Sequence, residues 1–277
     1  AKNNFIFLTK VLSATFSDFE VESFSSLQPL IYITSSKSTL QNFKCKNIGN
    51  PSNGAFLYLE NSDLKADNNS LANIRSINGG GAIYLSKFSL FQLSNSSFSN
   101  CSSMYGGVLY SFQTKTLKLI NIIISDSFST FAGGALYIKS ADAFESTNLS
   151  ISKSQNTAQK GVIYILMTSI INLYFNDTSL NSNIAKEGSG FYIFGQSNII
   201  INRANIINCS NSIFFAFSRA LIQVNLQNFS INNIPIISEI SESDVFNFNG
   251  INTLLENGFI KTEKEIHPQT KEPVLFK

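Results

Sequence analysis

The chain has 277 residues, of which 43% are hydrophobic and only 14% are charged, and its formal net charge is +2. No run of basic residues offers a track for phosphates, so the composition argues against nucleic acid as a partner. The apolar residues are interspersed with Asn and Ser. No apolar run approaches the roughly 18–20 residues of a membrane helix, so we expect no membrane span in this chain.

A strand-like apolar run already stands at residues 5–8, and Phe7 lies 25 residues before Tyr32. From residue 29 onwards one phrase recurs, and it reads Gly-Gly-Ala-Ile-Tyr-Leu at residues 80–85. A fixed repeat of this size indicates a solenoid. The tyrosines of the phrase, spaced by 26, 26, 26, 27 and 27 residues, are Tyr32, Tyr58, Tyr84, Tyr110, Tyr137 and Tyr164.

Each repeat also contains a second strand-like segment that is rich in Asn and Ser, as at residues 93–98, 119–124 and 147–151. Both segments alternate apolar and polar residues, which is the period of a β-strand, and no apolar stripe with helical spacing extends beyond a turn or two. We therefore predict an all-β fold, a right-handed parallel β-helix of about nine or ten coils, over residues 1–255.

The later repeats drift in length. Residues 190–194 place Ile193 in the tyrosine position, and further coils are expected at 212–215, 234–237 and 245–248. Residues 256–277 differ in composition, with eight charges, two prolines and the single histidine, His267. We expect this charged terminal segment to be a cap, an edge strand or a linker.

The aliphatic residues that flank each tyrosine predict that the tyrosines lie on the outer face of their strand, where their rings stack from coil to coil. This ladder is expected to be structural, with an aromatic stripe that binds a sugar or a protein partner as the alternative. A second ladder is predicted at the Asn position, because amide side chains hydrogen-bond along such a stack. Its members are Asn95, Asn121, Asn148, Asp177, Arg203 and Asn228.

Seven Asn-x-Ser/Thr sequons occur, and each would accept an N-linked glycan in a secreted protein. A chain this rich in Asn and Ser also produces sequons by chance. The candidate acceptors are Asn68, Asn95, Asn100, Asn148, Asn176, Asn208 and Asn228.

The three cysteines are predicted to be free, buried thiols. Cys101 and Cys209 fall at the same place in the repeat but four coils apart, and Cys45 lies about two coils from Cys101. These separations exceed the roughly 7 Å between Cα atoms that a disulfide allows.

Residues 80–83, with near copies at 106–109 and 133–136 and a Phe-x-x-Asn phrase at 229–232, resemble the repeats of the polymorphic outer membrane protein family. More widely, they are similar to the pectin-lyase-like right-handed β-helices. The resemblance covers about residues 29–235. It implies a large secreted or surface-exposed protein used for adhesion or structure, so we expect an extracellular or cell-surface location.

Catalytic residues are not evident. The acidic residues of the predicted core coils are scattered, no carboxylate pair of the kind that glycoside hydrolases use is visible, and no triad or metal-binding cluster is available. We therefore expect no enzymatic activity, no metal and no cofactor. These acids are Asp126, Asp142, Glu145, Asp177 and Glu187.

Three functions remain open from the sequence. The first is a structural or adhesive segment of a larger protein, and the second is a carbohydrate-active polysaccharide lyase or hydrolase. The third is a filament segment, because no capping sequence precedes residues 5–8, and an open β-helix edge recruits other strands. The expected partners are therefore other protein chains, further copies of this chain at that end, and carbohydrate.

Overall fold

The computed structural model describes most of the chain up to residue 210 and five strands beyond it. The strand expected at 234–237 and the charged segment from residue 257 onwards lie outside the described residues. Within the described residues every paired strand is parallel to its neighbours and no helix occurs. The described ranges are 6–50, 52–87, 89–158, 160–167, 172–185, 188–195, 197–210, 214–217, 222–227, 230–232, 246–251 and 254–256.

One sheet is formed by the tyrosine strands, which pair with one another in register from coil to coil, tyrosine against tyrosine. It contains β1 (Ile6–Thr9), β5 (Ile31–Thr34), β8 (Leu57–Glu60), β11 (Ile83–Ser86), β14 (Leu109–Phe112), β17 (Leu136–Lys139), β20 (Ile163–Met167), β22 (Phe191–Gly195) and β24 (Phe214–Phe217).

All other described strands belong to a second, sharply bent sheet. The longest strands continue through the bend of this sheet. They are β12 (Leu90–Ser99), β15 (Thr116–Ser125), β18 (Phe144–Ser152), β21 (Asn172–Asn181) and β23 (Ser197–Ile207). The shorter strands are β2 (Ala14–Ser17), β3 (Glu20–Val21), β4 (Phe24–Ser25), β6 (Lys37–Gln41), β7 (Lys44–Asn50), β9 (Asp63–Asp67), β10 (Ser70–Ser76), β13 (Ser102–Tyr105), β16 (Phe128–Ala132), β19 (Gln155–Asn156), β25 (Ile222–Gln227), β26 (Ser230–Asn232), β27 (Phe246–Ile251) and β28 (Leu254–Glu256).

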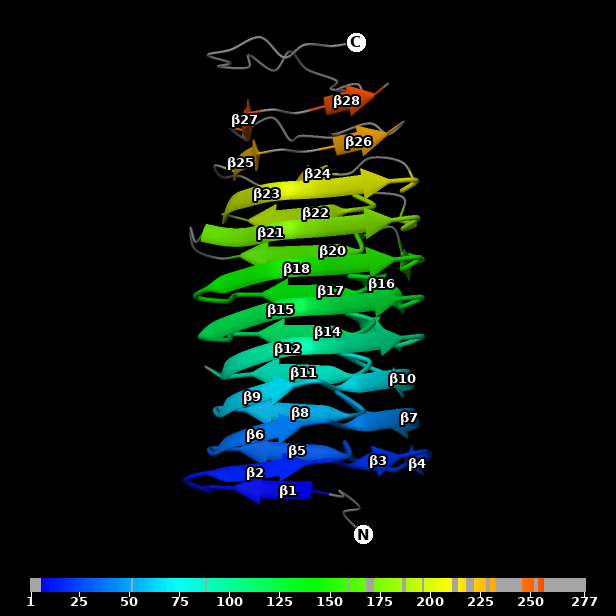
Figure 1. Ribbon diagram of the computed structural model, residues 1–277, viewed down its shortest axis with the longest axis vertical. Helices are drawn as coiled ribbons and strands as arrows, with labels where there is room; N and C mark the ends of the chain where they lie inside the picture. Colours follow the sequence, from blue (N-terminus) through cyan, green and yellow to red (C-terminus); the bar gives the residue numbers. More distant parts are fainter. Residues whose placement is uncertain are drawn as a thin grey trace.

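The turns of the chain stack along one axis, so that each strand lies against its counterparts in the turns before and after it (Figure 1). The molecule is thus a parallel β-helix, as the repeat predicted. About seven turns are described, slightly fewer than the nine or ten coils expected, because the later part of the chain is described as separate strands.

The core lies between the two sheets and is continuous along the rod. The residues on either side of each tyrosine point inward, and all twelve such residues from Ile31 to Ile165 are at most 1% exposed. They face the inward rows of the second sheet, which contain Phe91 and Phe144. Burial of these apolar rows supplies most of the favourable free energy of folding.

The rod turns its corners at residues in the left-handed backbone region, and within the described residues these fall into four columns. One column follows the tyrosine strand and contains Lys10, Ser35, Asn61, Lys87, Gln113 and Ser140. The first Asn corner, within the second sheet, contains Asp18, Asn42, Asn68, Asn95, Asn121, Asn148, Asp177 and Arg203. The second Asn corner, five residues later in most turns, contains Asn47, Asn73, Asn100, Asp126, Lys153, Ser182 and Asn208.

The fourth column, the glycine corner, precedes each tyrosine strand and contains Gly54, Gly80, Gly106, Gly133, Gly161 and Gly188. A positive φ alone does not demand glycine here, because the other three columns carry side chains. At Gly80 the reason is space, since an added Cβ would overlap the carbonyl oxygen of Ile83. The Gly-Gly-Ala-Ile-Tyr phrase therefore recurs because only glycine fits the close backbone approach at this corner.

Candidate functional site

The tyrosine rings form one continuous stack on the outer face of the first sheet, as predicted. Neighbouring ring centroids from Tyr32 to Tyr164 lie 4.7–5.0 Å apart, and the ring planes differ by at most 17°. Phe7 extends the stack at one end, 5.3 Å from Tyr32. Because each ring covers the faces of its neighbours, the stack presents ring edges and hydroxyl groups to its surroundings.

The stack also continues beyond Tyr164, where the sequence prediction was wrong. Tyr192 pairs in register with Tyr164 and stacks on it at 5.1 Å, whereas Ile193 points into the core and is fully buried. The turn between the two tyrosines is 28 residues long rather than 29, and one residue of slip reverses the face of a strand.

Part of the tyrosine stack packs against a side chain that the sequence did not mark. The Tyr105 ring packs edge-on against Tyr110 and Tyr137, with centroids 6.2 and 5.4 Å away. Tyr137, Tyr164 and Tyr192 are only 6–7% exposed, and the four tyrosines before them are half-buried. Tyr105 directly precedes the glycine corner, but no periodic signal marks it.

Burial changes the acidity of these phenols. It raises the pKa of Tyr32 and of Tyr164 to about 12, and it raises the pKa of Tyr84 and Tyr137 as well. Loss of water is the main cause in each case, since a phenolate is poorly stabilised in an apolar setting. The stack is therefore neutral at physiological pH, which suits a structural ladder.

The predicted Asn ladder is present, and its asparagines lie within the long strands β12, β15 and β18, at the point where a positive φ bends each strand. Asn121 donates its Nδ2 to Oδ1 of Asn95 at 2.8 Å, and Asn148 donates to Asn121 at 3.1 Å. Further along, the Arg203 guanidinium makes two hydrogen bonds of 2.6 Å to the Asp177 carboxylate. Asn228 lies outside the described residues.

Two parts of the ladder system were not predicted. The first Asn corner begins three turns earlier, where Asn68 donates to Asn42 and Asn42 donates to Asp18, both at 2.8 Å. A second ladder runs along the second Asn corner, where Asn100 donates to Asn73 at 2.8 Å and Asn73 to Asn47 at 2.9 Å. Spacings of 26 and 27 residues carried that signal in the sequence.

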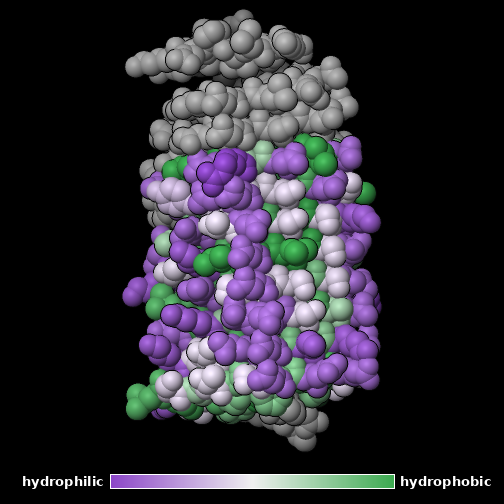
Figure 2. All heavy atoms as spheres, viewed as in Figure 1, coloured by the Kyte–Doolittle hydropathy of each residue, from purple (hydrophilic) through white to green (hydrophobic). Residues whose placement is uncertain are grey.

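The polar columns are visible on the surface. Figure 2 shows hydrophilic residues gathered in stripes that run along the rod over the strands of the second sheet. Between the two Asn corners lie two rows of outward residues that include Ser97, Ser150, Ser99 and Ser125, with the apolar Ile123 between Ser97 and Ser150.

The cysteines are free and buried, as predicted. Burial raises the pKa of Cys45 and Cys101 to about 12 and also raises that of Cys209. Because the thiolate is the reactive form, these groups act as small core side chains.

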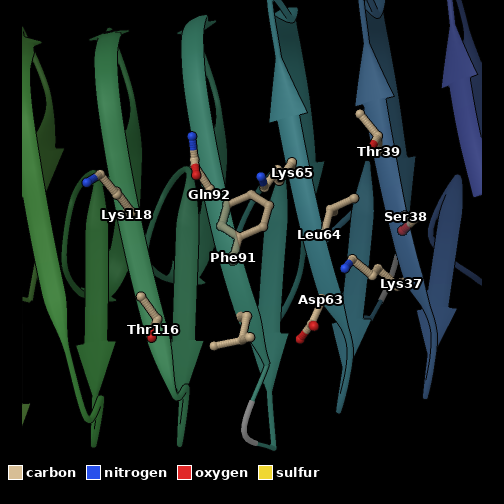
Figure 3. A pocket seen from close by; sticks show the side chains of 11 residues that line it. Lys37, Ser38, Thr39, Asp63, Leu64, Lys65, Phe91, Gln92, Thr116 and Lys118 are labelled. Atoms are coloured by element: carbon tan, nitrogen blue, oxygen red, sulfur yellow. The ribbon is translucent and has the colours of Figure 1, made fainter. Parts of the chain in front are cut away.

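A trough of about 450 Å³ lies on the outer face of the second sheet over β6, β9, β12 and β15 (Figure 3). Two rows of outward side chains cross it in register. The first row consists of Lys37, Asp63, Leu90 and Thr116, and the second of Thr39, Lys65, Gln92 and Lys118. The inward neighbours Ser38, Leu64 and Phe91 also contribute to its lining.

The charges of the trough are only partly neutralised. Lys118 donates to Glu145 Oε2 at 2.9 Å. Within the described residues, no hydrogen bond or ion pair engages the side chains of Lys37, Asp63, Lys65 or Gln92. The trough therefore offers ammonium, amide and carboxylate groups that a ligand could engage, beside the apolar side chain of Leu90.

The acids singled out in the sequence do not come together as a site. Asp126 stands at the second Asn corner and Asp177 at the first, while Glu145 pairs with Lys118. Among the described residues, no group of three or more His, Cys, Asp or Glu side chains is placed to hold a metal ion. Glu187 and His267 lie outside those residues.

Within the described part of the chain, no helix is long and apolar enough to span a membrane. Comparison with models of protein families, with curated proteins and with solved structures gave no match to the chain. The resemblance to outer membrane protein repeats therefore stays a prediction about family, while the β-helix that it implied is the fold observed.

Proposed function

We propose that this chain is a non-enzymatic, structural and adhesive segment of a larger secreted or cell-surface protein, and that it binds carbohydrate through the trough. The observation that carries the proposal is the set of polar side chains in the trough that no group within the described residues engages. At the two Asn corners, by contrast, the asparagine side chains hydrogen-bond to one another in ladders.

The chemistry of the trough suits a sugar chain. Gln92 and Lys65 can donate to sugar hydroxyls, Asp63 can accept from them, and Leu90 offers an apolar contact for a sugar ring. The four strands span about 14 Å along the rod, which is the length of a short oligosaccharide. The tyrosine stack is a poorer candidate, because a sugar stacks on the face of an aromatic ring and these faces are covered.

A panel of immobilised glycans tests the proposal. The wild-type chain should bind at least one glycan, and the Lys65→Ala and Gln92→Ala variants should bind it about tenfold or more weakly, the effect of losing a charged or bidentate hydrogen bond. Lys44, which is equally exposed on β7 outside the trough, provides the matched control: Lys44→Ala should bind like the wild type.

The same glycans distinguish a binding protein from the alternative, a carbohydrate-active enzyme. If the chain only binds, glycans incubated with it should gain no new reducing ends. New reducing ends would favour a polysaccharide hydrolase or lyase instead. If no glycan on the panel binds less tightly to the Lys65→Ala variant than to the wild type, the trough is refuted as a binding site.

End-to-end assembly is a second candidate, favoured by apolar side chains in the first described turn. Phe7, Leu12 and Leu27 are 51%, 94% and 69% exposed. Such residues are suited to contact a further turn from another chain or another copy. Sedimentation velocity should then show concentration-dependent association that a Leu12→Lys, Leu27→Lys double variant abolishes. A monomer at all concentrations would exclude self-assembly.

A further inference from the structure

The sequons are not scattered over the surface of the rod. Six of the seven lie in the described residues, and five of these have their asparagine at an Asn corner, exposed to solvent and with a positive φ. They are Asn68, Asn95 and Asn148 at the first Asn corner, and Asn100 and Asn208 at the second. The sixth, Asn176, is half-buried within β21.

Three of these asparagines, Asn68, Asn100 and Asn148, donate their amide to the asparagine one turn earlier, whereas Asn95 donates to the carboxylate of Asp67. Asn68, Asn95 and Asn100 each donate Nδ2 to an oxygen of the preceding turn at 2.8 Å, and Asn148 does so at 3.1 Å. An Nδ2 amide has two hydrogens, and one ladder bond uses one of them. The second hydrogen is therefore not required by the ladder.

The geometry of a stacked amide decides which hydrogen is left over. When amides repeat by translation, the N–H that points opposite to the C=O bond meets the oxygen of the next amide, as in a backbone ladder. The other N–H, on the same side as the oxygen, points sideways and away from the stack. In an N-glycosylated asparagine the sugar replaces this second hydrogen, since the glycosylated amide is trans like a peptide.

We propose that the Asn corners are N-glycosylation sites, at which a glycan is added without breaking the ladder. The sugar donor is an oligosaccharide carried on a polyprenyl diphosphate. Nδ2 forms a bond to the sugar C1, the bond from C1 to the diphosphate oxygen breaks, the diphosphate leaves with the electron pair, and one Nδ2 proton is lost to a base. The inference rests on the proposed secretion of the protein.

Spacing along the rod limits which sites are filled together. Asn68 and Asn95 lie in adjacent turns, about 4.8 Å apart, which leaves room for one glycan. Asn95 and Asn148 are two turns apart, and Asn100 and Asn208 are four turns apart on the other corner. Each molecule therefore carries a glycan on Asn68 or Asn95 but not on both, and independent glycans on Asn100 and Asn148.

Expression of the full chain behind a secretion leader in a eukaryotic host tests the proposal. Glycopeptide and intact-mass analysis should find Asn100 and Asn148 occupied and the pair Asn68 and Asn95 never doubly occupied. After trimming to one sugar per site, the melting temperature should stay within about 2 °C of that of the unmodified chain, because no ladder bond is lost. Empty corner sequons, double occupancy of the pair or a markedly lower melting temperature would overturn the proposal.

Two engineered sequons provide matched variants. Ile123 is 57% exposed, and Ile123→Thr creates a sequon at Asn121 in the middle of the first ladder, where we expect modification with the fold retained. Ala158→Ser creates one at Asn156, which is 5% exposed and donates Nδ2 to Ser129 Oγ at 2.6 Å. A folded, secreted chain with a glycan on Asn156 would show that corner geometry is irrelevant.

Glycan binding and glycan attachment can fail separately. Loss of trough binding in the Lys65→Ala variant would leave corner occupancy unchanged. Empty corner sequons in a secreted, folded chain that still binds a glycan would refute the present inference alone. The Ser150→Ala variant removes the Asn148 sequon but keeps its ladder amide, so it should lower the intact mass by one glycan without loss of stability.

Discussion

Replacing Gly80 with alanine should be among the most destabilising single changes in this rod. The new Cβ would stand in the left-handed region, which costs an L-residue about 1–2 kcal/mol. It would also overlap the Ile83 carbonyl oxygen and its carbon, both of which belong to the backbone and cannot rotate away. Overpacking of this kind adds about 1–3 kcal/mol, so we expect a loss of about 2–5 kcal/mol.

Gly49 provides the control for this change. It lies in β7 without a positive φ, and the nearest atom to an added Cβ is the Arg75 carbonyl oxygen at 4.0 Å. Alanine there should be neutral or stabilise the protein by about 0.5–1 kcal/mol, because it restricts the unfolded chain.

Urea unfolding followed by far-ultraviolet circular dichroism suits the measurement, since the chain has no tryptophan. At an unchanged slope, the Gly80→Ala variant should unfold at least about 1 M urea below the Gly49→Ala variant. Equal midpoints for the two variants would refute the argument that the glycine corner is fixed by backbone contact.

Three further predictions follow from the ladders and the core. Asn121→Ala should lower the urea midpoint more than Asn121→Gly, because both variants lose the bonds to Asn95 and Asn148 but glycine alone tolerates the positive φ; equal midpoints would contradict this. Because burial raises the pKa of Cys101 to about 12, iodoacetamide should label this thiol in urea but hardly at all in the native protein, as mass spectrometry of the digest can measure. Burial likewise raises the pKa of Tyr164 to about 12, so the native state keeps a phenolic proton that an unfolded tyrosine releases near pH 10. The free energy of unfolding should therefore fall as the pH rises from about 10 to 12. If instead all tyrosines ionise near pH 10, as measured by tyrosinate absorbance, while the protein stays folded, the prediction is wrong.

The parts of this structure that the sequence predicted are those that repeat. The tyrosine stack was predictable because each ring must contact its equivalent in the next turn, and the contact selects the same residue type each time. The glycine corner repeats for a similar reason. Tyr192 was misplaced because its turn is one residue longer than the turn before it, and spacing alone does not say where a loop absorbs an extra residue.

The features that the sequence did not predict are those that depend on contacts across the repeat. Tyr105 covers the stack from another strand, and no neighbouring turn has a tyrosine at its position. The trough was also unpredictable, because its Lys65 and Gln92 occupy one row only after the coils are aligned. The second Asn corner is an exception, since the spacing of Asn47, Asn73 and Asn100 marked it, although only Asn100 was singled out from the sequence, as a sequon.

The contrast between repeating and non-repeating rows bears on where function lies. At the first Asn corner, the six described residues that precede the Asp177–Arg203 pair are all Asn or Asp, because the positive φ and the ladder bond select these residue types. The outward row through Thr39, Lys65 and Gln92 instead changes size and charge at every turn and makes few contacts of its own. Folding therefore leaves the residues of this row free to vary. Recognition of a particular ligand requires such variation, because a surface that is identical at every turn cannot define one binding position along the rod. Specific contacts are thus expected in the trough, whereas the first Asn corner, where the backbone favours Asn or Asp, is suited to carry the same modification at several levels of the rod.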